Sequence, residues 1–84
     1  MNMETVALGE KAKRILDMPE FKEIFQQVKM DTFDKWAVTP NSEHEKLLEY
    51  HNALCGLNAF YAKVTAYVRA GEFEKNRDEA IPQP

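Results

Sequence analysis

A seven-residue repeat of large apolar residues constrains the fold of this chain more than any other feature. The seven residues at the two repeating positions between residues 47 and 68 are all large and apolar: Leu47, Tyr50, Leu54, Leu57, Tyr61, Val64 and Val68. In an α-helix this spacing gathers the side chains into one stripe, which must pack against another helix because water solvates it poorly. The repeat therefore predicts an all-α fold around one long helix, from about residue 43 to residue 70.

Turn signals before this helix predict a second helix, at about residues 19 to 37. Pro19 is tolerated in the first turn of a helix, and Pro40 disfavours helical geometry at Thr39. Six residues share one broad face of this helix: Phe21, Ile24, Phe25, Val28, Thr32 and Trp36. Because the connection to the long helix is short, we expect the two helices to form an antiparallel hairpin.

The two ends of the chain are predicted to differ. An N-terminal helix at about residues 4 to 16 would carry an apolar face, which consists of Leu8, Ala12, Ile15 and Leu16. Gly71 fits the left-handed position just past the end of the long helix. Charged residues and prolines follow, so we expect one helical domain at residues 1–72 and a flexible, disordered tail at residues 73–84.

Length and composition limit the classes of protein. A chain of 84 residues forms one domain at most and has only a marginal core, so a partner chain would add stability. The formal net charge of -3 makes a general nucleic-acid binder unlikely. No apolar run reaches the ~20 residues that span a bilayer, and the first residues lack a signal-peptide core. The single cysteine, Cys55, suits a reducing compartment.

The long helix carries more apolar surface than its stripe uses. Ala53, Phe60 and Tyr67 form a second stripe on one flank. One explanation is a three-helix monomer; the other is a homo-oligomer that associates through Phe60 and Tyr67. Trp36, near the hairpin turn, is either an interface anchor or a core cap. The candidate interface residues are therefore Ala53, Phe60, Tyr67 and Trp36.

No arrangement of residues predicts an enzyme. His51 and Cys55 share a helical face and could contribute to a zinc site, but a structural site needs four ligands. A catalytic thiol needs an oxyanion hole, which a continuous helix does not provide. The glycines are isolated, so no phosphate-binding loop is present. We therefore expect no catalytic residue, no metal and no cofactor.

Several short segments resemble small helical-hairpin proteins of tailed bacteriophages, over roughly residues 15 to 72. These segments are Leu16-Asp17-Met18-Pro19-Glu20-Phe21, Trp36 with Thr39-Pro40, Gly56-Leu57-Asn58-Ala59-Phe60 and Val68-Arg69-Ala70-Gly71-Glu72. The resemblance implies an all-α fold and a phage or prophage origin, and it brings no catalytic residue.

Three functions remain open on this basis. The first is a non-enzymatic module that binds phage or host proteins, in the virion or during its assembly, which would place it in the host cytoplasm or the virion. The second is a small acidic inhibitor of a host enzyme or defence system. The third is an oligomeric sponge for a small ligand such as a nucleotide.

Overall fold

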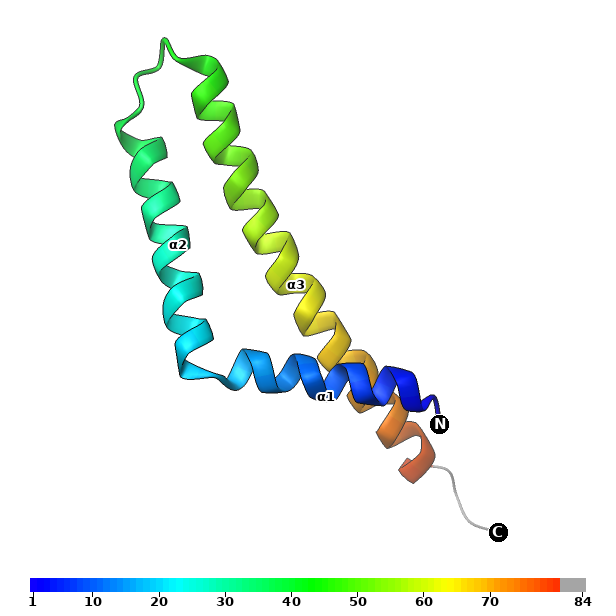
Figure 1. Cartoon of the computed structure of the whole chain (residues 1–84). Coiled ribbons are helices and arrows are strands. Elements are labelled where there is room, and N and C mark those ends of the chain that lie inside the picture. The colour runs from blue at the N-terminus through cyan, green and yellow to red at the C-terminus, as the bar shows by residue number, and fades with distance from the viewer. Residues whose placement is uncertain (81–84) are drawn as a thin grey trace. The chain divides into compact units, whose positions relative to one another are not determined.

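The structure is a computed structural model that describes the backbone of residues 1–80 and the side chains of residues 1–77. Three α-helices follow one another along the chain: α1 (Met3–Asp17), α2 (Pro19–Val38) and α3 (His44–Ala80) (Figure 1). No strand occurs among the described residues. The predicted all-α fold with three helices is confirmed, and its boundaries at the starts of the helices agree within one residue.

A capping hydrogen bond and a proline explain where α1 and α2 begin. The Asn2 side chain accepts a hydrogen bond from the Thr5 N–H at 3.1 Å, which satisfies a donor of the first turn of α1. At the other end, Met18 is extended and its N–H donates to the Ile15 carbonyl. An extended residue is favoured before proline, so α1 ends there and Pro19 opens α2.

The long helix ends later than the sequence predicts. α3 continues beyond the predicted end at residue 70 and includes Gly71 and residues 73–80. The prediction that Gly71 caps the helix in a left-handed conformation is wrong, because no described residue has a positive φ. Residues 81–84, the end of the predicted flexible tail, lie outside the described residues.

Contacts divide the chain into two compact units, and each is described here by itself. The crossing unit contains Met1–Met18 and Ala62–Pro84, so it consists of α1 and the second part of α3. The hairpin unit, Pro19–Tyr61, consists of α2 and the first part of α3. The boundary between the two units falls inside α3.

Candidate interaction surface

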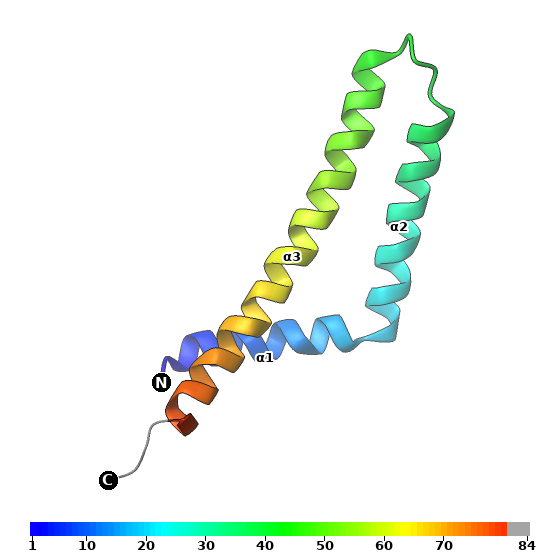
Figure 2. The same cartoon turned by 180° about the vertical axis from the view of Figure 1, so that it is seen from behind.

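In the crossing unit, α1 crosses the second part of α3 (Figure 2). Two glycines, Gly9 and Gly71, bring the two helices into backbone contact there. A Cβ atom on Gly9 would lie 2.8 Å from the Tyr67 carbonyl oxygen and 3.0 Å from the Gly71 Cα. A Cβ atom on Gly71 would lie 3.1 Å from the Gly9 Cα. Such distances leave no room for any side chain. Gly71 is therefore needed for a close helix crossing and not for a cap.

The buried residues of the described chain all surround this crossing. The buried apolar side chains are Val6, Ala12 and Val64, and both glycines of the crossing are buried as well. The predicted apolar face of α1 is wrong in part, since Leu8 and Ile15 are exposed. A crossing at backbone distance admits only small residues at its centre, so the larger side chains of Leu8 and Ile15 stay exposed.

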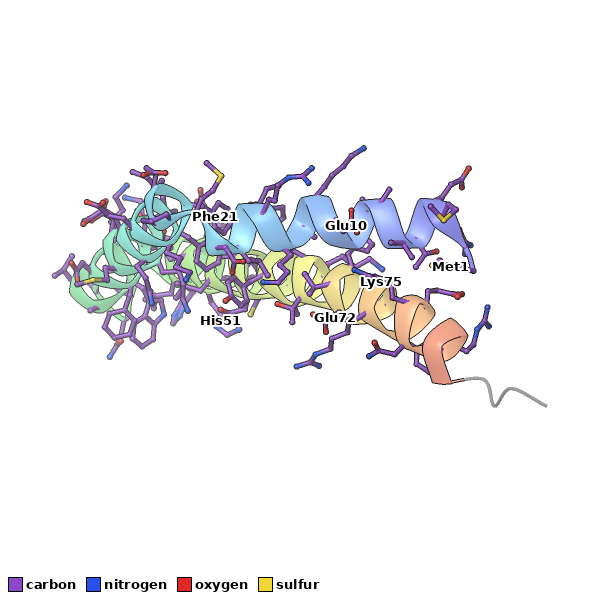
Figure 3. The ribbon with its side chains drawn as sticks, turned by 90° about the horizontal axis from the view of Figure 1, so that it is seen from below. Met1, Glu10, Phe21, His51, Glu72 and Lys75 are labelled. Carbon is purple, nitrogen blue, oxygen red and sulfur yellow. The ribbon has the colours of Figure 1, made fainter. Side chains whose placement is uncertain are left out.

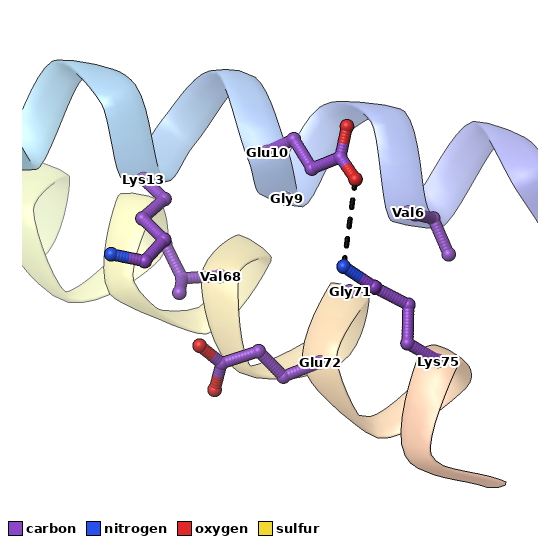
Figure 4. A pocket seen from close by; sticks show the side chains of 8 residues that line it. All are labelled: Val6, Gly9, Glu10, Lys13, Val68, Gly71, Glu72 and Lys75. Atoms are coloured by element: carbon purple, nitrogen blue, oxygen red, sulfur yellow. Dashed lines mark ion pairs between the residues drawn. The ribbon is translucent and has the colours of Figure 1, made fainter. Parts of the chain in front are cut away.

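Charged residues surround a small depression beside the crossing (Figure 4). Lys75 Nζ lies 3.7 Å from the Glu10 carboxylate, and Lys13 Nζ lies 2.8 Å from the Asp17 carboxylate. The hydrogen bond and charge of Asp17 raise the pKa of the Lys13 ammonium above its ordinary value. The depression holds about 140 Å³, less than the roughly 300–1,000 Å³ of small-molecule sites. It offers little space for a nucleotide.

In the hairpin unit, α2 packs antiparallel to the first part of α3 through large side chains. On α2 the half-buried apolar residues are Phe21 and Phe25, and the Phe25 and Tyr61 ring centroids are 5.4 Å apart. The heptad positions supply the half-buried residues of this part of α3: Leu47, Tyr50, Leu54 and Leu57. The sequence repeat thus correctly identifies the side of α3 that faces α2.

The contacts between α2 and α3 in the hairpin unit do not form a buried core. No residue between Pro19 and Tyr61 is buried, although the segment contains many large apolar residues. Nine of them have exposed fractions of 40% or more, among them Ile24 (63%), Val28 (42%), Phe33 (52%), Trp36 (40%) and Phe60 (53%). A two-helix hairpin can cover only one side of each helix, so these side chains remain in water.

Helical geometry sorts the exposed side chains onto two opposite faces of the hairpin. Successive helix residues turn by about 100°, and the half-buried residues fix which side of each helix points inward. One face, here called the Phe60 face, consists of Ile24, Val28, Ala53, Gly56 and Phe60. The opposite face, here called the Trp36 face, consists of Phe33, Trp36, Leu48, His51 and Cys55. Figure 3 shows the side chains, with His51 of the Trp36 face labelled.

The four predicted interface residues do not form one surface. Ala53 and Phe60 are exposed on the Phe60 face, whereas Trp36 lies on the other face, with its ring centroid 5.8 Å from that of Phe33. Tyr67 belongs to the crossing unit, where it is half-buried and Lys63 Nζ lies 5.3 Å from its ring centroid. We therefore treat Tyr67 separately from the hairpin surfaces.

Ile24 and Val28 belong to the predicted broad apolar face of α2, but the structure exposes both side chains. The available signal was the width of that face, because its six residues span more of the helix circumference than one neighbouring helix covers.

His51 and Cys55, the pair considered for a metal site, lie close together on α3. His51 Nε2 and Cys55 Sγ are 3.5 Å apart, and both side chains are exposed. Within the described residues, no three histidine, cysteine or acidic side chains come together as a possible metal site. No described helix is both long enough and apolar enough to cross a membrane.

Comparisons with protein-family models, curated proteins and solved structures find no significant match. The resemblance to phage hairpin proteins therefore stays a prediction from sequence.

Proposed function

We propose that this chain is a non-enzymatic protein–protein interaction module and that the hairpin unit is its binding surface. One observation carries the proposal: large apolar side chains are exposed on both faces of a hairpin that contains no buried residue. A helical partner laid on either face would remove these side chains from water, which is the main favourable term in association.

The exposed aromatic side chains indicate how much apolar area a partner would bury. Phe33, Trp36 and Phe60 are each between 40% and 53% exposed. An aromatic side chain contributes roughly 150–250 Å² when buried, so these three leave on the order of 300 Å² for a partner to cover. Aromatic residues recur as anchors of interfaces because they bury much area at little cost in conformational entropy.

The phage resemblance suggests where such a module would work. In a tailed phage it would bind a phage or host protein, in the virion or in the host cytoplasm during assembly. The proposal of an acidic host inhibitor differs only in the identity of the partner. The proposal of a ligand sponge needs a pocket between the chains of an oligomer, since the depression in the crossing unit is too small for a typical small-molecule site.

Photo-cross-linking in cells of the natural source tests this proposal. We would replace Phe33 or Phe60 with the photoreactive residue benzoylphenylalanine, which preserves an aromatic ring at each position. Lys11, an exposed residue of α1, is the matched control position. After irradiation we expect cross-linked species from Phe33, Phe60 or both, and much less product from Lys11. Mass spectrometry of each species identifies the partner.

The products distinguish the alternatives. Cross-links to structural phage proteins support a role in assembly, and cross-links to a host enzyme support the inhibitor. An absence of products from both hairpin positions, with a correctly folded chain, would contradict an interaction module.

A further inference from the structure

Gly56 has no explanation within its own chain. A Cβ atom on Gly56 would meet nothing within 4 Å, whereas the Cβ atoms of Gly9 and Gly71 would strike backbone. A glycine in the middle of a helix lowers its stability, so one that no neighbour requires is unexpected. The other two glycines admit a second helix at close range. The open space over Gly56, here called the hollow, likewise leaves room on the Phe60 face for a side chain of another helix.

The same face carries a projection that matches this hollow. Phe60 stands one helical turn after Gly56 and is 53% exposed, and Ala53 is small and lies beside them. A surface that carries both a projecting ring and a matching hollow can pair with a copy of itself around a two-fold axis. In an antiparallel contact between two α3 helices, each Phe60 ring would occupy the hollow over Gly56 of the partner.

The apolar residues of α2 lie at the same level as this pair. The contact between Phe25 and Tyr61 shows which residues of α2 and α3 stand side by side. Both helices rise about 1.5 Å per residue in opposite directions, so Val28 stands level with Asn58, midway between Gly56 and Phe60. One two-fold axis can therefore pass the centre of the patch on both helices.

Two charged residues of α2 are placed so that the same two-fold axis would pair them between the two copies. Glu20 and Lys35 are exposed, and they lie at nearly equal distances along α2 on either side of Val28. Neither has an ion-pair partner within the described residues. An antiparallel contact centred on Val28 would place Glu20 of each copy opposite Lys35 of the other. Asp31 lies at the outer edge of this face, where its carboxylate accepts a hydrogen bond from Gln27 at 2.8 Å.

The area of the Phe60 face is also large enough for a specific dimer interface. α2 contains 20 residues and is therefore about 30 Å long, and two adjacent helices are about 20 Å wide. The face thus provides on the order of 600 Å² per copy, which reaches the lower bound of specific interfaces at about 1,200 Å² in total. One helix alone would provide half of this area, so both helices are needed.

We infer that the occupant of the Phe60 face is a second copy of this chain. The two hairpin units pack face to face as an antiparallel four-helix bundle, with α2 on α2 and α3 on α3 of the partner. The Trp36 face stays on the outside of this dimer and remains available to another protein. This inference rests on the proposed function, since it names one partner of the same binding surface.

Cysteine cross-linking of the purified full-length chain tests the arrangement. Cys55 is exposed on the Trp36 face, so the wild-type chain itself reports on that face. In a Cys55→Ser background, Val28→Cys places a thiol next to the proposed axis and Phe33→Cys places one on the opposite face. With a short bismaleimide we expect covalent dimer from Val28→Cys at least tenfold faster than from Phe33→Cys or from the wild type. Faster reaction of Phe33→Cys would overturn the inference.

Two further sets of variants test the contacts themselves. Glu20→Lys and Lys35→Glu should each raise the dimer dissociation constant severalfold, and the double exchange should restore it because the pairs are re-formed with reversed sign. Gly56→Leu should fill the hollow and abolish the dimer while helicity by circular dichroism is kept. An unchanged dissociation constant in all of these variants would overturn the arrangement.

The oligomeric state of the wild type and the cross-links in cells together distinguish this inference from the proposed function. A wild-type chain that stays monomeric at all concentrations would overturn the second copy as the occupant. If hairpin positions still cross-link to a different protein in cells, the proposed function stands without the dimer. If they cross-link to nothing, both fail.

Discussion

The two units use α3 in opposite ways. In the crossing unit small residues let the backbones touch, and the surrounding side chains Val6, Ala12 and Val64 are buried. In the hairpin unit large residues face one another, yet none is buried. Small residues therefore allow close contact between helices in the crossing unit. The large residues of the two hairpin helices leave part of their apolar surface exposed to water. The contact in the crossing unit is closed within the chain, and we propose that the open contact in the hairpin unit is completed by a partner.

Gly9→Leu, in the crossing unit, should have the largest effect on the free energy of unfolding. The new side chain would meet the backbone of α3 at 2.8 Å and 3.0 Å already at its Cβ atom. Because backbone cannot move aside cheaply, the helices must separate, and we expect a loss of about 3 kcal/mol in the free energy of unfolding. Urea denaturation of dilute protein measures this loss.

Gly56→Leu is the matched control, because it makes the same substitution where nothing lies within 4 Å. In dilute, monomeric protein it should stabilise the chain by up to about 1 kcal/mol through helix propensity. Equal effects of the two substitutions would show that the two units do not differ as described.

Leu54→Ala should have a smaller effect that depends on protein concentration. Leu54 is only half-buried in the hairpin unit, so its loss should cost about 1–2 kcal/mol in dilute protein, below the ~2–5 kcal/mol of a fully packed leucine. At concentrations where hairpins associate, the cost should rise towards the full range, because a second chain completes the packing. Thermal unfolding at several concentrations checks this, and a cost independent of concentration would count against association.

Much of the fold could be predicted from sequence because its signals are local. The heptad positions from Leu47 to Val68 identify the inward side of α3, and Pro19 and Pro40 mark the breaks between helices. Gly71 was misread because a glycine near an expected helix end fits a cap equally well. Its position seven residues after Val64 continues the heptad repeat and was the available signal.

The binding surface was harder to predict for a different reason. Ala53 and Phe60 were recognised from surplus apolar spacing along one helix. Spacing cannot show that Trp36 lies on the opposite face, because this depends on how α2 and α3 are oriented against each other. The exposure of Ile24 and Val28 could not be predicted from their shared face, because it depends on how much of that face a single neighbouring helix covers.

The smallest expected effect concerns the charged border of the crossing unit. The Lys13 ammonium donates to Asp17 at 2.8 Å, which raises the pKa of Lys13. A raised pKa in the folded state means that the pair stabilises the fold at neutral pH and that this contribution is lost as pH rises through the folded-state pKa. Nuclear magnetic resonance titration should find the Lys13 pKa above its ordinary value and should find it lowered in Asp17→Asn. Because the pair is exposed, the change in stability should be slight.

Sedimentation equilibrium tests the central claim, that the hairpin unit is completed by another chain, most directly. The wild type should show a reversible equilibrium between monomer and dimer. Phe60→Glu should be monomeric with unchanged helicity, because it places a charge in the centre of the interface. Phe73→Glu is the matched control, since Phe73 is also exposed but lies in the crossing unit, and it should remain dimeric. A monomeric wild type, or a Phe60→Glu variant that dimerises as the wild type does, would contradict the account.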